Sequence, residues 1–137
     1  MKKIILVFCF AMLSLNGCSK TEKSKPIDQK QGSDLNKYAE EQKDKAAKIV
    51  NINPKMDIVN LAKCTAASMK IGQGIGIYKV WTEELTNRYR KIYPDKSVSE
   101  LDSYVGERIT DKLRSLRESG FDSQQAFSKY YDMNCKN

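Results

Sequence analysis

Apolar side chains recur at helical spacing through most of the chain after residue 53, and this periodicity restricts the fold more than any other feature. Apolar residues three or four positions apart line one face of an α-helix, whereas a half-buried strand needs strict alternation. Three stretches carry the pattern: Ile58, Leu61, Ala62, Thr65, Ala66 and Met69; Tyr78, Trp81, Leu85, Tyr89 and Ile92; and Leu101, Tyr104, Val105, Ile109, Leu113 and Leu116. The sequence therefore predicts an all-α fold, a small bundle of four to five helices.

Local signals predict where these helices begin and end. Asn53 and Pro54 form a favourable N-cap and first-turn pair, so we expect the first core helix to begin there. Ser97 and Glu100 match a capping box, and Gly120 is expected to end the helix that they start. The remaining expected features are a stop at Tyr93-Pro94 and a last short helix from Asp122, whose inward side chains are Phe127, Tyr130 and Tyr131.

The N-terminal segment has the pattern of a secretory signal. Lys2 and Lys3 precede an apolar run from Ile4 to Leu15, in which Ser14 is the only polar residue. Such a run is too short to cross a bilayer with about 30 Å of hydrocarbon. Residues 1–17 are therefore interpreted as a targeting segment and not as part of the folded domain.

The end of this segment, Leu15-Asn16-Gly17-Cys18, resembles the lipobox of bacterial lipoproteins. The resemblance implies cleavage before Cys18, a diacylglycerol thioether on its sulfur and an N-acyl chain such as palmitate. It covers roughly the first 20 residues and matches no family for the mature domain. Ser19 resembles the outer-membrane class, so we expect a lipid-anchored protein of the cell envelope, with the outer membrane favoured. An ordinary cleaved signal or a short N-terminal anchor is the alternative.

Given that resemblance, the four cysteines divide into separate roles. Cys9 leaves with the signal and Cys18 carries lipid, which leaves Cys64 and Cys135 to pair in an exported protein. A bridge between them would close a loop of roughly 70 residues, for which chain entropy allows about 4 kcal/mol. Two buried thiols, or a catalytic or metal-binding cysteine, are the alternatives that the sequence leaves open.

The mature chain is expected to have three parts. Residues 18–33 are polar except for Ile27 and are predicted to be a disordered lipidated tether, about 20 Å long on average. Residues 34–52 are predicted to form a peripheral helix and its connection, with Asp34 as the cap. Residues 53–137 are predicted to form the helical domain.

The glycines at positions 72, 74 and 76 alternate with other residues in Ile71-Gly72-Gln73-Gly74-Ile75-Gly76-Ile77. Three glycines in five residues would make a poor strand. The run is not a G-x-G-x-x-G or Walker loop, so nucleotide binding is not expected. A hinge and a close approach of helix backbones both remain open.

Catalytic and cofactor signals are weak. The chain contains no histidine, which removes serine-histidine and cysteine-histidine catalysis and the common zinc arrangements. Glu83 and Glu84 are adjacent and diverge on a helix, and Glu107 and Asp111 lie among basic residues on one face. We therefore expect no catalytic residue, metal or other cofactor, although spacing alone leaves an acid pair possible in principle.

The net positive charge is compatible with binding to negatively charged surfaces but does not identify a specific partner. Removing Lys2 and Lys3 with the signal lowers it from +7 to +5. An exported protein meets little nucleic acid, and no nucleic-acid module is present, so no such partner is expected. The net positive charge of the mature chain would favour attraction to anionic lipid head groups or cell-wall polymers.

An aromatic and basic group suggests one candidate surface for a protein partner. Tyr, Trp and Arg supply much of the binding energy at interfaces, and Arg88, Arg90 and Tyr93 lie close together in the sequence. Trp81 nearby is expected to be core.

The predicted function is non-enzymatic binding by a small, membrane-anchored helical envelope lipoprotein, whose general build resembles that of entry-exclusion and phage-exclusion lipoproteins. An exclusion or immunity factor, an inhibitor and an accessory subunit all fit this description. The anchor supplies the membrane contact, an envelope protein of unknown identity is the expected partner, and no small-molecule substrate is indicated. The alternative is a small cell-wall-binding or cell-wall-processing protein that uses surface carboxylates such as Glu107.

Overall fold

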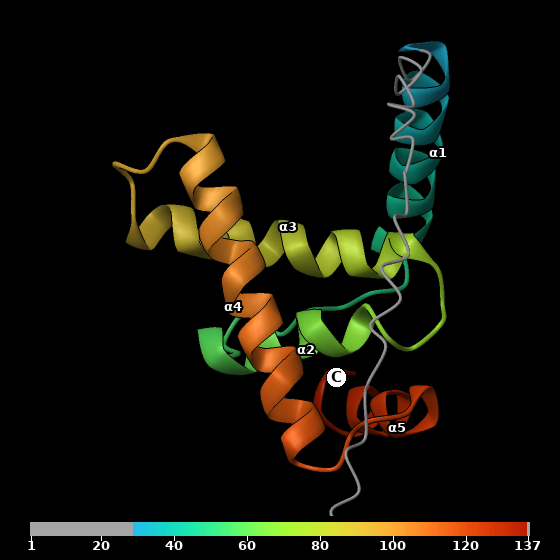
Figure 1. Ribbon diagram of the computed structural model, residues 1–137, viewed down its shortest axis with the longest axis vertical. Helices are drawn as coiled ribbons and strands as arrows, with labels where there is room; N and C mark the ends of the chain where they lie inside the picture. Colours follow the sequence, from blue (N-terminus) through green and yellow to red (C-terminus); the bar gives the residue numbers. More distant parts are fainter. Residues whose placement is uncertain (1–28, 137) are drawn as a thin grey trace, which may run out of the picture.

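The computed structural model describes residues 29–136, with side chains from Ser33 onward, and these residues form five helices and no strand (Figure 1). The helices are α1 (Gln29–Ala47), α2 (Ile58–Ser68), α3 (Ile75–Ile92), α4 (Val98–Glu118) and α5 (Gln124–Asn134). The predicted all-α fold is confirmed. Among these helices, none is long and apolar enough to span a membrane.

The short helix α2 lies at the centre of the bundle. It packs against α3, α4 and α5, and Leu61, Ala62 and Ala66 on it are fully buried. The predicted start at Asn53-Pro54 is wrong, because the Asp57 carboxylate accepts hydrogen bonds from the backbone N–H groups of Val59 and Asn60 and caps the helix instead. An N-cap needs such a side-chain oxygen at the first free amides, and Asn53 uses its own within a turn, accepting from Lys55.

The other predicted boundaries agree closely with the structure. Ser97 and Glu100 form the capping box of α4, and Gly120 adopts a positive φ of 90° just beyond the end of that helix. Ser123 caps α5, and Tyr93 caps the C-terminus of α3. The expected inward stripes are buried along their centres, whereas two residues at helix ends, Met69 and Ile92, are exposed.

A disulfide and an aromatic contact attach the last helix to the core. Cys64 on α2 and Cys135 after α5 form the predicted disulfide, with a Cα–Cα distance of 5.6 Å. Beside it, the buried Trp81 Nε1 donates a hydrogen bond of 2.7 Å to the Tyr131 hydroxyl, and the two rings meet edge to face. Among the described helices, the backbone of α5 lies close to that of α2 alone, and Trp81 links it to α3 through Tyr131, so the disulfide and this contact contribute much of its attachment.

The first helix, α1, is attached differently. It contacts only α3 among the described helices, and Figure 1 shows its N-terminal part extending beyond α3. It begins at Gln29, so the prediction that Asp34 caps it is wrong, and residues 29–33 of the expected tether are helical. Once the part that packs on α3 is helical, adding turns at its N-terminal end costs little, because propagation is easier than nucleation.

The glycine run has two roles. Gly72 and Gly74 have φ values of 74° and 84°, which residues other than glycine rarely adopt, and they form the turn into α3. At Gly76 a Cβ atom would overlap the Gln42 carbonyl group of α1 and lie 3.2 Å from the Ala46 Cβ. The close approach of two helix backbones, one of the two open interpretations, is therefore present at Gly76.

Candidate partner-binding surface

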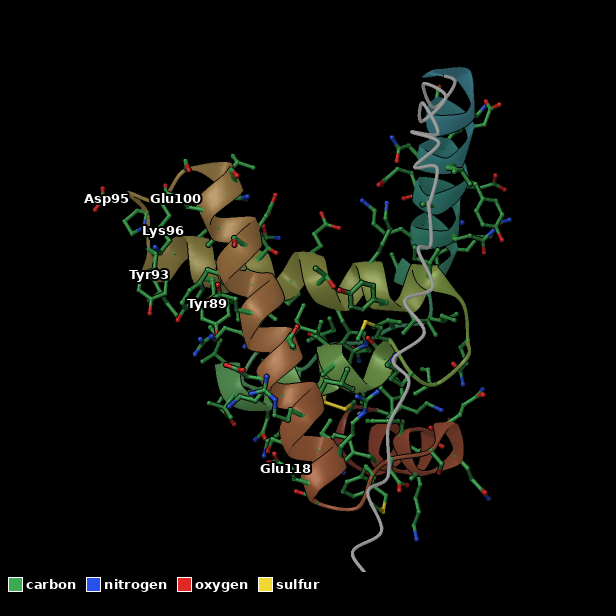
Figure 2. The ribbon with its side chains drawn as sticks, viewed as in Figure 1. Tyr89, Tyr93, Asp95, Lys96, Glu100 and Glu118 are labelled. Atoms are coloured by element: carbon green, nitrogen blue, oxygen red, sulfur yellow. A yellow bond between two sulfur atoms is a disulfide. The ribbon has the colours of Figure 1, made fainter. Side chains whose placement is uncertain are left out.

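The end of the molecule where α3 meets α4 carries a cluster of three tyrosines, of which Tyr89 and Tyr93 are labelled in Figure 2. Tyr89 and Tyr93 are stacked with ring centroids 6.2 Å apart, and Tyr104 on α4 meets them edge to face at 5.1 and 5.2 Å. The Tyr93 and Tyr104 hydroxyl groups are 3.3 Å apart. Tyr89 is buried and forms the base, whereas Tyr93 reaches the surface. We call these three residues the tyrosine cluster.

Two cations lie against the tyrosine cluster. The Lys96 ammonium is 5.8 Å from the Tyr93 ring centroid and 5.7 Å from that of Tyr104, and the Arg108 guanidinium is 5.1 Å from Tyr104. Such contacts at exposed sites contribute about 0.5–1 kcal/mol each. The hydrogen bond with Tyr93 raises the pKa of Tyr104, and burial raises that of Tyr89, so both stay neutral at physiological pH. The cluster is therefore aromatic in character with a positive rim.

Exposed apolar side chains are concentrated beside this cluster. Ile92, Tyr93 and Val98 are three of the ten large exposed hydrophobic residues among those described, and they lie where α3 ends, in the turn after it and where α4 begins. The turn is held by the capping box, by the Tyr93 N–H bond to the Tyr89 carbonyl and by the Lys96 N–H bond to the Tyr93 carbonyl. We call this turn, residues 92–98, together with the tyrosine cluster, the α3–α4 end.

The structure separates the residues that the sequence grouped as a partner surface. The Arg88 guanidinium turns inward, donating to the carbonyl oxygens of Met56 and Asn53 and pairing with Glu84 at 2.7 Å. It holds the segment before α2 against α3. Arg90 is exposed, and its hydrogen bond to Asn87 is long at 3.3 Å. Of the three predicted residues, Arg90 and Tyr93 are thus the ones that present groups to solvent.

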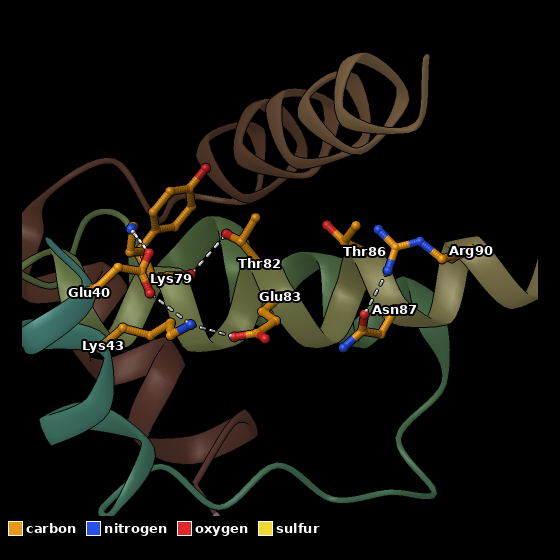
Figure 3. Close-up of a pocket in the computed structure, with 9 residues that line it drawn as sticks. Glu40, Lys43, Lys79, Thr82, Glu83, Thr86, Asn87 and Arg90 are labelled. Atoms are coloured by element: carbon orange, nitrogen blue, oxygen red, sulfur yellow. Dashed lines mark hydrogen bonds and ion pairs between the residues drawn. The ribbon is translucent and has the colours of Figure 1, made fainter. Parts of the chain in front are cut away.

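A polar groove of about 450 Å³ lies between α1 and α3 (Figure 3). Glu40 accepts from Lys79 at 2.6 Å and from Lys43 at 2.9 Å, and Lys43 also pairs with Glu83 at 3.3 Å. The Lys79 and Lys43 contacts lower the pKa of Glu40 to about 2. A carboxyl group that is so acidic stays ionised at neutral pH and cannot donate a proton there, so the network is suited to joining α1 to α3.

The remaining carboxylates that the sequence singled out do not converge. Glu84 pairs with Arg88, and Glu83 faces α1. Asp111 pairs with Arg108 at 3.4 Å and with Arg114 at 3.5 Å on the surface of α4, near Glu107. Within residues 29–136, no group of three or more cysteine, aspartate or glutamate side chains is arranged to hold a metal ion.

The sequence missed the contribution of α4 to the α3–α4 end. The sequence pattern predicts Tyr104 on the inward stripe of its helix, and it assigns no role to Lys96. A signal was present, since Pro94 and the Ser97 cap force a tight return that brings the start of α4 next to the end of α3. The predicted lipidation site, Cys18, lies outside the described residues.

Comparison with known proteins gives no relative from which a function can be transferred. No protein-family model, curated protein or solved structure matches this chain significantly. The function must therefore be argued from the residues themselves.

Proposed function

We propose that this protein is a lipid-anchored protein of the cell envelope that acts by binding another envelope protein, and that the α3–α4 end is its binding surface. The observation that carries the proposal is the coincidence of exposed apolar side chains, a tyrosine cluster and cations at one end of the bundle. Interfaces concentrate their binding energy in such aromatic and arginine-rich centres.

Rigidity supports this choice of surface. Tyr93 is stacked on the buried Tyr89 and flanked by Tyr104, so its ring loses little freedom when a partner covers it. A binding group that is already ordered avoids part of the entropy cost of association. Ile92 and Val98 add apolar area around it, and Arg90 supplies a cation one turn away.

The anchor is the second half of the proposal and rests on the lipobox resemblance at Leu15 to Cys18. Attachment through acyl chains at Cys18 places the domain near a membrane surface, with the outer membrane favoured by Ser19. Cys18→Ala is expected to leave an unlipidated, uncleaved precursor, as measured by metabolic labelling with a fatty acid and by the mass of the chain. Normal lipid labelling of Cys18→Ala would refute the anchor.

The binding surface is tested by site-specific photocrosslinking in the native host. A photoreactive residue in place of Tyr93 is expected to form a defined adduct with one envelope protein. A matched probe at Thr110, an exposed residue on the surface of α4, is expected to form none. The same adduct pattern from both positions, or no adduct from Tyr93, would contradict the proposal.

A charge reversal then tests the cationic rim. Arg90→Glu is expected to weaken recovery of the crosslinked protein without affecting folding, because Arg90 is exposed. Arg88→Glu is the instructive comparison, since it removes the bonds to Met56 and Asn53 and is expected to lower stability as well. Unchanged recovery with Arg90→Glu would limit the surface to its apolar part.

A further inference from the structure

The polar groove between α1 and α3 follows one face of α3. Six of its lining side chains lie three or four positions apart on that helix: Lys79, Thr82, Glu83, Thr86, Asn87 and Arg90. Such spacing places them on a single stripe, and the helix rises about 16 Å from the first to the last. Thr82 and Thr86 form one row, and Glu83 and Asn87 form the other (Figure 3). The groove is therefore elongated, with α1 as a wall at one end.

The two ends of this groove differ in how far their charges are already paired. Near α1, the two glutamates that line the groove are held by Lys43 and Lys79. Arg90 at the far end forms no ion pair with any described residue and has only the long hydrogen bond to Asn87. One cation of the groove is thus left to pair with an acid from outside the chain.

The middle of the groove offers neutral hydrogen-bonding groups. Within the described chain, neither the Thr86 hydroxyl nor the side-chain N–H groups of Asn87 bond to another residue. The Thr82 hydroxyl donates to the Tyr78 carbonyl at 2.8 Å, and its oxygen can still accept. Tyr78 also lines the groove and is partly buried against the core. Hydroxyl and amide groups are therefore combined with one aromatic ring.

This lining does not suit the common ways of binding a peptide. Peptides add a strand to a sheet edge, place an apolar helix face in an apolar groove, lie across several aromatic rings or pair phosphates with clustered arginines. Residues 29–136 contain no strand, and the groove is lined by one aromatic ring, no aliphatic side chain and one unpaired arginine. Nucleic acid requires several free cations. A saccharide, by contrast, presents rows of hydroxyl groups and the C–H faces of its rings.

We propose that this groove binds an acidic saccharide, a sugar chain that carries a carboxylate or phosphate group. The acidic group lies on Arg90, which can donate two parallel hydrogen bonds to it, and the sugar hydroxyls bond to Thr82, Thr86 and Asn87. The site is separate from the α3–α4 end and shares only Arg90 with it. The source of the ligand, a glycan of the envelope, rests on the proposed location, whereas the chemistry of the groove does not.

Binding in this groove is expected to hold α1 against α3. Glu40 and Lys43 on α1 line the end of the groove opposite Arg90, so a saccharide that fills it touches both helices. A ligand that binds only the closed form, present at ten times its dissociation constant, slows the opening of α1 about tenfold. Hydrogen exchange of α1 amides therefore reports binding.

The proposal is tested by hydrogen exchange of the full-length lipidated chain in detergent micelles. Two acidic probes, soluble peptidoglycan fragments and de-acylated lipopolysaccharide, are compared with neutral N-acetylchitotetraose. At least one acidic probe is expected to slow exchange in α1 more than the neutral sugar does, and the probe that acts identifies the source. No slowing by either acidic probe, or equal slowing by the neutral sugar, would overturn the proposal. The same effect from the free peptidoglycan peptide, or from acetate or phosphate alone, would also overturn it.

Substitutions in the groove locate the effect. Thr86→Val and Asn87→Ala each remove groups with no other partner in the described chain, so each is expected to weaken binding about three- to tenfold and to leave the fold intact. Thr110→Val, on the surface of α4 outside the groove, is the matched control and is expected to bind normally. Arg90→Gln is expected to remove the preference for acidic over neutral sugar. Undiminished binding by the chain with both Thr86→Val and Asn87→Ala would contradict the site.

The photocrosslink at Tyr93 separates this proposal from the proposed function. The chain with Thr86→Val and Asn87→Ala is expected to lose the saccharide effect and to keep the Tyr93 adduct. If the acidic probes have no effect while the adduct forms, the saccharide site alone fails. If the probes act and no adduct forms, the α3–α4 end alone fails. Purified Cys18→Ala is expected to bind the probes normally, because the anchor is not needed for the groove.

Discussion

The bundle around α2 and the helix α1 are held by different forces. The bundle buries Leu61, Trp81 and Leu85 completely and adds a disulfide, so its attachment is apolar and covalent. Among its described side chains, helix α1 has one buried apolar side chain, Ala46, and it is attached to α3 by a close backbone approach at Gly76 and by two ion pairs, Lys43 with Glu83 and Glu40 with Lys79. We therefore expect α1 to open more easily than the core.

This difference indicates where conformational change is cheapest. Regions with few buried apolar contacts open with a free energy well below that of global unfolding. Helix α1 is such a region, and it is also the helix that follows the predicted tether.

The disulfide is expected to have the largest effect, and only on the bundle. Replacing both Cys64 and Cys135 with Ala removes a crosslink between positions 71 residues apart. Because this crosslink restricts the unfolded chain, its loss is expected to lower the free energy of unfolding by about 4 kcal/mol. Urea denaturation followed by Trp81 fluorescence measures the loss. A change below about 1 kcal/mol would mean that packing, and not the crosslink, holds α5 in place.

The next effect concerns the hydrogen bond beside the disulfide. Tyr131→Phe leaves the buried Trp81 N–H without its acceptor, which costs about 1–3 kcal/mol. Tyr130→Phe is the matched control, since the Tyr130 hydroxyl forms no hydrogen bond among the described residues. Chemical denaturation should give a lower free energy of unfolding for Tyr131→Phe than for Tyr130→Phe. Equal values would show that the hydrogen bond does not stabilise the core.

Gly76→Ala is expected to act on α1 and to spare the bundle. The new methyl group overlaps the Gln42 carbonyl, and overpacking of this kind costs about 1–3 kcal/mol. Hydrogen exchange should show faster exchange of α1 amides with little change in α2. Gly106→Ala, whose methyl group meets nothing within 4 Å inside α4, should instead stabilise by about 0.5–1 kcal/mol. Uniformly faster exchange would contradict the separation of the two regions.

Acid is expected to loosen α1 in a defined range. The pKa of Glu40 is lowered from 4.5 to about 2 in the folded chain, so its contribution is present above pH 4.5 and is lost as the pH falls toward 2. Exchange of α1 amides should therefore accelerate across that range before the bundle unfolds, and Glu40→Gln should remove the dependence. Glu41→Gln is the control, because Glu41 pairs with Lys45 inside α1 and does not reach α3.

Features that depend on neighbouring residues were predictable from the sequence. The capping box at Ser97 and Glu100 and the stop at Gly120 are local, because their partners lie within one turn. The disulfide followed from the lipobox resemblance, which left two cysteines in an exported chain. The burial of Trp81 followed from its place in a helical stripe.

Features that depend on distant partners were not predictable. Gly76 looks like its neighbours in the sequence, and its role exists only because α1 passes over it. Arg88 looks like Arg90, yet carbonyl groups 32 and 35 residues earlier in the chain turn it inward. Asp57, and not Asn53, caps α2. Its two carboxylate oxygens accept hydrogen bonds from the backbone and the side-chain N–H groups of Asn60.

The bond between Cys64 and Cys135 also determines what a single proteolytic cut does to the protein. Every residue of α3 and α4 lies between these two cysteines. A single peptide cut between them, for example in the exposed turn at Asp95, therefore leaves the two pieces covalently joined. The nicked protein keeps both halves of the α3–α4 end within reach of each other, whereas a cut before Cys64 separates the whole domain from whatever holds its N-terminus.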